Sequence, residues 1–295
     1  MAAVVVIDKP AGMTSHDVVQ FVRRRLNLAK AGHTGTLDPM ATGVLPVCLG
    51  EATKIAGLLS GEDKRYRAHA TLGLETDTGD ATGRELARGS LSGIDFARIE
   101  QVARDFVGTI EQRPPAYSAI RVDGKRAYER ARAGEVVELP VRQVTISALS
   151  VEMLAGDHLL LDVTCSKGTY VRSLIADIGR ALGCLATMSG LCRLRSGALS
   201  LEQAVQLDQL DDDSPMLSMD SALAHLPAAD VEREAARRIQ LGQPLAFVLS
   251  AGAANPETLW RVRCDDRLIA LASYNEGCLR PKRVFLASAA APSAD

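Results

Sequence analysis

The chain has 295 residues, of which 47% are hydrophobic and 24% charged, and its formal net charge is −2. This composition is ordinary for a soluble globular protein, and the length allows one large domain and a smaller one. No apolar run reaches the roughly 18 residues that a membrane-spanning helix needs, and the N-terminal MAAVVVIDKP lacks the basic segment of a signal peptide, so we expect neither.

The first quarter of the chain predicts strands and helices joined by a glycine-rich loop. Residues 4–8 (VVVID) predict a strand. A helix follows, because Thr14 and Asp17 are spaced as in a capping box and the next apolar residues recur at helical spacing. After the glycine-rich loop we expect a buried strand at 44–50 and a short helix at 51–59.

The middle of the chain contains clearer periodic patterns. Residues 64–74 alternate between apolar and polar, which predicts a strand, and the Thr, Asp and Gly residues of 75–85 predict a loop. Apolar residues at helical spacing predict a helix over 94–108, ended by Gly108. Residues 113–134 predict a strand, an Asp-Gly turn and a basic helix.

Two apolar segments, 144–154 and 158–166, are predicted to pair as strands, and 167–183 to pass from loop into a helix ended by Gly183. Strands and helices do not alternate strictly, and hairpins join several strands. We therefore predict the α+β class, with a central mixed or antiparallel sheet flanked by helices.

An acidic, irregular stretch at 207–227 predicts a domain boundary. It separates a large domain at 1–225 from a small β-rich domain at 228–288, and an Ala/Pro/Ser-rich tail at 289–295 is predicted to be disordered. The small domain is expected to contain one helix and three short strands, at 231–242, 258–264, 268–273 and 283–287.

The six cysteines form no Cys-x-x-Cys pair and lie mostly in apolar segments. We therefore expect reduced, buried thiols in a cytoplasmic protein, and neither a zinc site nor a disulfide framework. They are Cys48, Cys165, Cys184, Cys192, Cys264 and Cys278.

Basic clusters occur in three segments, 21–30, 121–132 and 279–285, although the whole chain is nearly neutral. A solvated helix face explains any one such cluster. Several clusters in a chain of balanced charge favour a face that binds a polyanion.

The stretch GHTGTLDPMATGVLPVCLG, residues 32–50, surrounds one carboxylate, Asp38, with glycines, threonines and small apolar residues. Its composition alone favours a turn, because Asp-Pro initiates turns. Met40 stands where a phosphatase-type second acid would be, and no zinc-protease, P-loop or dinucleotide-binding motif occurs. His33 lies five residues earlier, and a lone histidine in such a loop is typically a structural hydrogen-bonding group.

Five long motifs of the chain resemble the TruB family of tRNA pseudouridine synthases. They come in the family's order and spacing, and the resemblance covers nearly all of residues 4–200, while the C-terminal segment resembles the PUA-like RNA-binding domain of bacterial members. The motifs are DKPAGMTSHDVV, GHTGTLDPMATGVLPVCLGEATK, DKRYRAHATLG, TDTGDATG and CSKGTYVRSLIADIG.

This resemblance implies the isomerisation of uridine to pseudouridine at position 55, in the T loop of tRNA. The reaction breaks the N1–C1′ glycosidic bond, turns the uracil and rejoins it through C5. It needs neither a cofactor nor a metal. The expected partner is the T arm of tRNA, and we expect a monomer in the cytoplasm.

The resemblance also assigns roles to residues. Asp38 matches the nucleophile, since a carboxylate can form a covalent adduct and leave again, and Arg172 matches the arginine that pairs with it. Whether the carboxylate attacks the ribose or the base, or removes a proton from C2′, stays open. Without the family, a solvated charge would be the ordinary reading of an arginine at a helix start.

The uracil pocket is expected to contain Tyr66, Tyr170 and the apolar Leu191. Tyr66 would stack on the flipped base, and its hydroxyl is a candidate for proton transfer, although a tyrosine at this strand position is ordinarily a core residue. His33 would contact or flip the nucleotide, and Lys9 in the DKPAG motif is expected to be structural.

The basic segments supply the candidates for contact with RNA phosphates, which position the RNA without reading its sequence. They are Arg23, Arg24, Lys125, Arg126, Arg130 and Lys282.

Three alternatives remain at this stage. One is a pseudouridine synthase that modifies rRNA, which shares the aspartate nucleophile. Another is an RNA-binding chaperone that folds tRNA without chemistry. A hydrolase that uses Asp38 is a third, although no second acid or metal pattern supports it.

Overall fold

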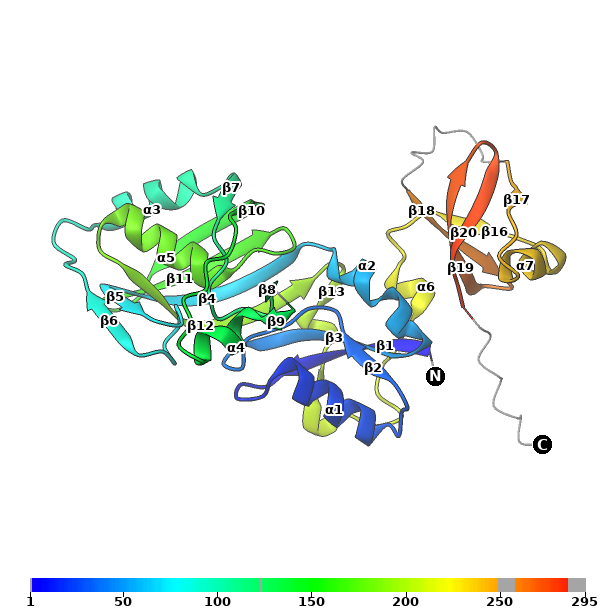
Figure 1. Ribbon diagram of the computed structural model, residues 1–295, viewed down its shortest axis with the longest axis horizontal. Helices are drawn as coiled ribbons and strands as arrows, with labels where there is room; N and C mark the ends of the chain where they lie inside the picture. Colours follow the sequence, from blue (N-terminus) through cyan, green and yellow to red (C-terminus); the bar gives the residue numbers. More distant parts are fainter. Residues whose placement is uncertain (1, 123, 249–257, 286–295) are drawn as a thin grey trace.

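The computed structural model describes residues 2–122, 124–248 and 258–285. Within them, strands form an 11-stranded mixed sheet, a separate five-stranded sheet and two short hairpins, with helices packed on the sheets (Figure 1). The predicted α+β class with a mixed central sheet is confirmed.

The strands of the large sheet follow the order β14-β1-β3-β12-β4-β11-β10-β7, with β2, β13 and β15 paired at its margins. Their bounds are β1 (Ala2–Lys9), β2 (Ala31–His33), β3 (Thr42–Gly50), β4 (Lys64–Leu72), β7 (Gly108–Gln112), β10 (Arg142–Met153), β11 (His158–Cys165), β12 (Ala186–Ser196), β13 (Leu199–Ser200), β14 (Val205–Gln206) and β15 (Leu217–Ser218).

This sheet consists of two halves that meet at one short parallel contact. β3 and β12 pair through Cys192 with Thr42 and through Arg193 with Gly43. Gly43 has a φ of +94°, and a Cβ there would overlap the main chain of Arg193. Glycine is therefore required where the two halves join.

Different helices cover the two halves. α3 (Phe96–Asp105) and α5 (Val171–Leu182) pack on the half that contains β12, β4, β11 and β10. α1 (Ser15–Arg25) covers one face of β1 and β3, and η1 (Glu51–Ile55), α2 (Ala56–Ser60) and α6 (Met219–Ala222) cover the other. Short 3₁₀ turns, η2 (Leu201–Gln203) and η3 (Leu207–Gln209), lead to β14 and β15.

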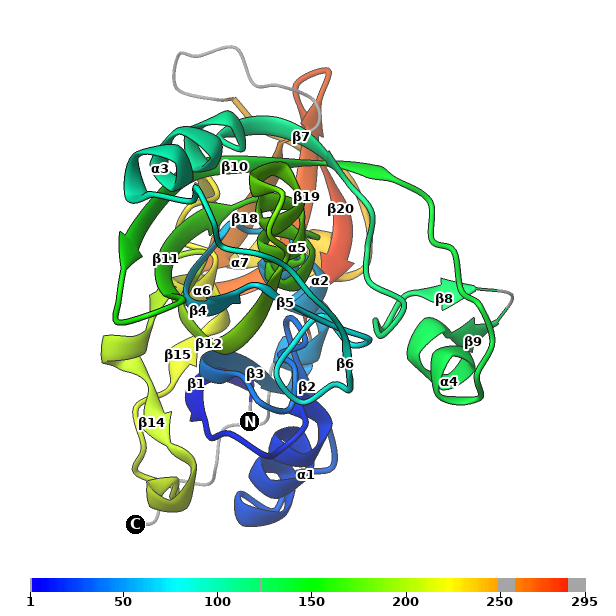
Figure 2. The ribbon, with the colours of Figure 1, turned by 90° about the vertical axis from the view of Figure 1, so that its left-hand side faces the viewer.

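A basic segment stands off from the body of the large sheet, as Figure 2 shows. It contains the hairpin β8 (Arg121–Val122) and β9 (Lys125–Arg126), followed by α4 (Ala127–Arg132). The sequence predicts a strand, an Asp-Gly turn and a basic helix for 113–134. The helix is present, the strand is limited to the two residues of β8, and Asp123 of the turn lies outside the described residues.

The small sheet is formed by the C-terminal part of the chain, in the order β16-β18-β19-β20-β17. Leu271 and Phe285 from this part pack in the same apolar cluster as Val4 and Met219 of the first part. The elements are β16 (Ala228–Asp230), α7 (Arg233–Gln240), β17 (Leu245–Ala246), β18 (Leu259–Cys264), β19 (Arg267–Asn275) and β20 (Cys278–Val284).

Apart from the two short hairpins, strands up to Leu217–Ser218 thus belong to the large sheet and strands from Ala228 onwards to the small one. The boundaries at 1–225, 228–288 and 289–295 remain predictions, and the last of these ranges lies outside the described residues.

Several predicted elements have different bounds in the structure. The strand expected at 283–287 begins earlier, at Cys278, as β20, and residues 286–287 lie outside the described residues. Pro281 is accommodated at a shift in the pairing of β20 with β19. The helix expected at 51–59 begins as the 3₁₀ turn η1. The loop expected at 75–85 is flanked by a short hairpin of β5 (Leu74–Thr76) and β6 (Glu85–Arg88).

All six cysteines are free, and Cys48, Cys165 and Cys184 are buried as expected, whereas the other three are partly exposed. None of the helices in the described part of the chain combines the length and apolar character that crossing a membrane demands.

Candidate active site

Asp38 lies in the loop between β2 and β3, at the first position of a tight turn. Its carbonyl accepts a hydrogen bond from the N–H of Ala41 (3.0 Å), with Pro39 as the second residue of the turn. The turn suggested by composition is therefore present. The carboxylate, however, is free to act elsewhere, because the turn uses only the main chain of Asp38.

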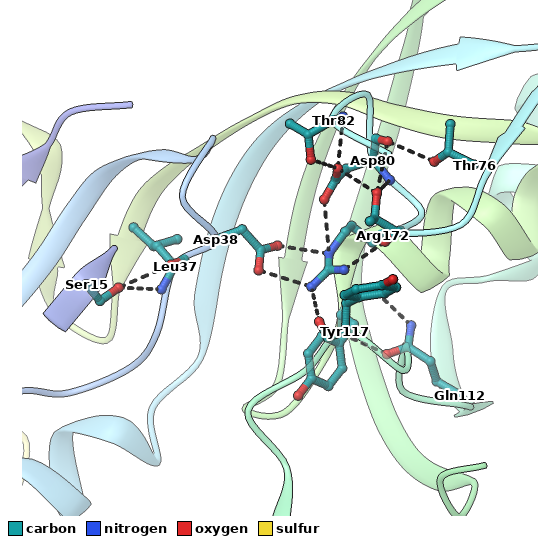
Figure 3. Close-up of polar contacts among 11 residues, drawn as sticks. Ser15, Leu37, Asp38, Thr76, Asp80, Thr82, Gln112, Tyr117 and Arg172 are labelled. Atoms are coloured by element: carbon teal, nitrogen blue, oxygen red, sulfur yellow. Dashed lines mark hydrogen bonds and ion pairs between the residues drawn. The ribbon is translucent and has the colours of Figure 1, made fainter. Parts of the chain in front are cut away.

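The N-terminal part of the chain holds this turn from both sides. The hydroxyl of Ser15 accepts a hydrogen bond from the N–H of Leu37 (2.8 Å) and donates one to its carbonyl (3.2 Å), as Figure 3 shows. Beyond Asp38, the buried ammonium of Lys9 donates to the carbonyls of Pro39 (3.2 Å) and Ala41 (2.6 Å). The residues before and after Asp38 are thus fixed separately.

Lys9 also donates to the carbonyl of Pro10 (2.8 Å), so its ammonium has three main-chain acceptors. Burial lowers the pKa of Lys9 to about 8, and the nearby Asp38 carboxylate opposes this change. The structural role expected for Lys9 is therefore support of the Asp38 turn, and this support depends on its protonation.

A second buried cation, Arg193 on β12, anchors the start of the same loop. Its Nη2 donates to the carbonyl of Gly35 (3.1 Å) and its Nε to that of Val44 (2.7 Å). Arg193 is 1% exposed. It therefore connects the loop of Asp38 to the half of the sheet that carries Tyr66.

Arg172, in the first turn of α5, forms an ion pair with Asp38. Its Nη2 donates to Oδ1 (3.0 Å) and its Nε lies 2.9 Å from Oδ2. Its Nη1 donates to the carbonyl of Thr78 and Nη2 to that of Tyr117, both at 2.8 Å. The pair predicted from the resemblance is thus formed, and the guanidinium is held by three separate segments (Figure 3).

The TDTGDATG stretch forms the loop between β5 and β6 and contacts the guanidinium of Arg172. Its buried Asp80 has Oδ2 3.9 Å from the Nε of Arg172. The other carboxylate oxygen accepts hydrogen bonds from the hydroxyls of Thr78 (2.9 Å) and Thr82 (2.6 Å) and from the N–H of Thr82 (3.0 Å). Arg172 therefore lies between two carboxylates, of which only Asp38 is partly open to solvent.

The carboxylate of Asp38 has 30% of its side-chain surface exposed, against 4% for Arg172. Burial raises the pKa of Asp38, and Arg172 opposes this increase by its charge and its hydrogen bond. Without that arginine the carboxylate would be harder to ionise. An ionised, oriented carboxylate with an open side is suited to nucleophilic attack or proton abstraction.

Tyr66 and Leu191 lie close together on the neighbouring strands β4 and β12. Both pack in the apolar cluster that also contains Leu37 and Ala41, which flank Asp38 in the chain. Tyr66 is 9% exposed. Burial raises the pKa of its phenol, and the guanidinium of Arg193 opposes this increase. The site therefore combines a carboxylate with an aromatic ring and an apolar wall.

Tyr170 is half-buried and occupies the N-cap position of α5, two residues before Arg172. His33 lies on β2, where its main chain pairs with β3. Burial lowers the pKa of His33, and the positive charge of Arg193 adds to the effect. Both effects favour the neutral form of its ring.

The candidate phosphate-binding residues fall in three places. Arg23 and Arg24 are exposed in the last turn of α1, Lys125 and Arg126 are exposed on β9, and Lys282 is exposed on β20. Arg130 on α4 is less available, since its Nε lies 2.5 Å from Oε2 of Glu135. Over the described ranges, no group of three or more His, Cys, Asp or Glu residues has an arrangement that could hold a metal ion.

The sequence did not indicate four residues that organise this site: Asp80, Arg193, Ser15 and Gln112, whose side-chain amide binds the main chain of Tyr170. The Thr and Asp residues of TDTGDATG were a signal for Asp80, since such side chains commonly form local hydrogen bonds in loops. Most bonds of the others are to main-chain atoms, which leave no pattern in the sequence.

Comparison with known proteins places the chain in a family. Residues 23–171 match the N-terminal domain model of the TruB family of pseudouridylate synthases, and residues 172–225 match the tRNA pseudouridylate synthase B C-terminal domain. Proteins named tRNA pseudouridine synthase B are 44% identical in Burkholderia pseudomallei (97% of both chains) and 42% in an Azoarcus species (96% of this chain, 94% of that protein).

Two solved structures share the fold over most of its length. A Cbf5-Nop10-Gar1 complex matches with a TM-score of 0.74 and 30% identity, and an H/ACA RNP bound to a substrate RNA containing 2′-deoxyuridine matches with 0.73 and 28%. Each match covers 96% of this chain and 85% of the other.

Proposed function

Because the chain belongs to the TruB family of pseudouridylate synthases, we propose that it isomerises uridine to pseudouridine in tRNA, at position 55 in the T loop. The observation that carries this proposal is the ion pair of Asp38 with Arg172, in a loop whose Leu37 and Ala41 pack in the same apolar cluster as Tyr66 and Leu191. A protein that only folds RNA has no need of an oriented carboxylate in such surroundings.

In this reaction Asp38 is the nucleophile. The N1–C1′ bond breaks, the uracil turns, and C5 forms the new bond to C1′. The hydrogen on C5 leaves as a proton and N1 gains one, so the composition of the nucleotide is unchanged. Arg172 keeps the carboxylate ionised and directed, since its guanidinium contacts both oxygens.

The target uridine lies within folded RNA and is flipped out to reach Asp38, at a cost of a few kcal/mol, roughly, for unstacking and unpairing. Tyr66 offsets part of this cost by stacking on the base, and Leu191 and Tyr170 complete the pocket. The raised pKa keeps the phenol of Tyr66 protonated, which suits stacking and hydrogen-bond donation. Accepting the C5 proton would require the phenolate that burial disfavours.

The tRNA is held through its T arm by basic residues of α1, of the β8–α4 segment and of β20. Arg23, Arg24, Lys125, Arg126 and Lys282 are exposed, whereas Arg130 is partly buried and would have to leave Glu135. The neighbour with bound substrate RNA supports the idea that this fold presents its site to a nucleotide in RNA. The proposed enzyme acts as a monomer in the cytoplasm, without a metal or cofactor.

The test uses T-arm tRNA labelled with tritium at uracil C5, because forming the C5–C1′ bond expels that hydrogen. Wild type is expected to release tritium, and Asp38→Asn to release none while binding the RNA with unchanged affinity. Asp105→Asn, at an exposed position of α3, is the control and should behave as wild type.

Release only from labelled rRNA fragments would replace the tRNA substrate by an rRNA one. RNA binding without release from either substrate would favour the folding chaperone. Release by Asp38→Asn at the wild-type rate would refute the assignment of the nucleophile.

A further inference from the structure

Two residues that lie between the five quoted sequence motifs, Gln112 and Arg142, contact Tyr170. Gln112 ends β7 and Arg142 begins β10, and the two are directly opposite each other in the antiparallel pairing of these strands. One contacts the main chain of Tyr170 and the other its ring.

Gln112 binds both polar groups of the Tyr170 main chain. Its side-chain Oε1 accepts a hydrogen bond from the N–H of Tyr170 (2.8 Å), and its Nε2 donates to the Tyr170 carbonyl (3.1 Å). Gln112 is 1% exposed, so water cannot replace these bonds. The amide therefore fixes the main chain at the position where α5 begins.

The same carbonyl of Tyr170 also accepts the N–H of Leu174 (3.0 Å), the first hydrogen bond of α5. Arg172 follows two residues after Tyr170. Gln112 consequently fixes both the Tyr170 main chain and the point from which Arg172 reaches Asp38.

Arg142 covers the ring of Tyr170. Its guanidinium carbon lies 4.8 Å from the ring centroid, within the range of a cation–π contact. The same guanidinium donates to the carbonyl of Gly168, two residues before Tyr170. Because its position is fixed at a second point, Arg142 limits the orientations that the Tyr170 ring can adopt.

We propose that Gln112 and Arg142 are positioning residues, which hold Tyr170 in one orientation for contact with the uracil ring. This inference rests on the proposed function, in which Tyr170 lines the uracil pocket. It assigns a role in the site to the β7–β10 strand pair, which contributes no residue of the Asp38–Arg172 pair.

The kinetic test compares Gln112→Glu and Arg142→Gln with wild type. Glutamate keeps the size of the side chain but cannot donate to the Tyr170 carbonyl. We expect kcat for tritium release to fall about 10- to 100-fold in either variant, with the Kd for tRNA unchanged, because small misplacements of this kind cost rate rather than binding. Arg142→Lys should recover part of the loss.

Matched controls come from the neighbouring pair of the same strands, Glu111 and Gln143, which are opposite each other and exposed. Glu111→Gln and Gln143→Ala should keep wild-type kcat. Combining Arg142→Gln with Tyr170→Leu makes the test specific. If Arg142 acts only through the ring, the change should cost less than about twofold in the Tyr170→Leu background.

A readout without activity separates this inference from the proposed function. The chain has 5 tyrosines, so labelling with fluorotyrosine gives few fluorine NMR resonances. The resonance of Tyr170 is assigned as the one that is missing in Tyr170→Phe. Arg142→Gln should shift or broaden it. Three results would each overturn the proposed positioning of Tyr170: an unchanged Tyr170 resonance, an unchanged kcat, or a loss of kcat from Arg142→Gln that is as large in the Tyr170→Leu background as in wild type. Absence of tritium release by wild type would instead refute the proposed function.

Discussion

The Asp38–Arg172 centre and the basic β8–α4 segment are built in opposite ways. Arg172 bonds to groups that are 134, 94 and 55 residues away in the chain. In the β8–α4 segment, by contrast, the N–H of Ala127 donates to Ile120 and that of Tyr128 to Ser118, both within ten residues or so.

This difference corresponds to two tasks. A carboxylate that reacts with one atom must be held within a fraction of an ångström, and long-range bonds from several segments achieve that. A surface that holds a phosphate backbone needs charge more than exact geometry. We therefore expect changes at the centre to affect kcat and changes in the β8–α4 segment to affect affinity.

The largest effect is expected from Arg172→Gln. It removes the donors to Asp38, Thr78 and Tyr117, and kcat should fall about 100-fold or more. Since Arg172 lowers the pKa of Asp38, its loss should also move the acid limb of the pH–rate profile to higher pH. Arg172→Lys should have a kcat nearly as low as that of Arg172→Gln. The control Arg180→Lys, at an exposed position of α5, should keep the wild-type kcat. An increase in KM alone would contradict this expectation.

Removal of charge from the basic segment tests the other half of the comparison. Lys125→Gln combined with Arg126→Gln should weaken tRNA binding about 10-fold and reduce the slope of log K against log salt by about two. The rate at saturating tRNA should not change. The double variant Arg88→Gln, Arg104→Gln is the control and should bind tRNA as wild type does. If Lys125→Gln with Arg126→Gln lowers kcat and leaves tRNA affinity unchanged, the β8–α4 segment acts as part of the Asp38–Arg172 centre instead.

Ser15→Ala should have a smaller effect on the centre. It leaves the buried N–H of Leu37 without its acceptor, which costs about 1–3 kcal/mol of folding stability, and it loosens the residue next to Asp38. We expect kcat to fall about 3- to 10-fold with unchanged tRNA affinity. Urea unfolding measures the stability, with the exposed Ser92→Ala as the reference. Equal values for both variants would argue against a role for Ser15.

The smallest effect concerns pH. Lys9 has a pKa lowered from 10.5 to about 8, so over this window the unfolded chain holds more protons than the folded one. Its contribution to the free energy of unfolding therefore rises with pH across the window. Activity should change in the opposite direction, because the neutral amine has two N–H donors for three carbonyls.

We expect kcat to decline about threefold as pH rises through 8, a loss comparable to one hydrogen bond. Lys9→Met should have a lower kcat than wild type at pH 7, and its kcat should not decline further as pH rises through 8. If the decline persists in Lys9→Met, the titration of another group causes it. Circular dichroism at each pH separates loss of activity from unfolding.

The strands β4 and β12 show what the sequence could predict of the fold. β4 alternates buried and exposed residues without interruption, and its pattern was recognisable. β12 lies beside it over most of its length but carries two register shifts against it, between Met188 and Gly190 and between Arg193 and Arg195. Each shift breaks the period of two on which strand prediction depends, so the strand was not predicted.

The same limit applies to the site. The resemblance led to Asp38 and Arg172, because both lie in long motifs. Arg193 and Gln112 were not found, since their hydrogen-bond partners are main-chain groups of a kind that nearly every residue possesses. Only the packing of distant segments shows which carbonyl a buried donor reaches.

The contact between β3 and β12 has a consequence for folding during synthesis. Asp38 leads into β3, near the start of the chain, whereas Arg172 and β12 are synthesised more than a hundred residues later. An unfinished chain that ends before Arg172 has no arginine beside its Asp38 carboxylate, and it lacks the strand β12 that joins β3 to β4. Catalytic competence and closure of the sheet arise in the same late step, so a truncated product would carry no working centre.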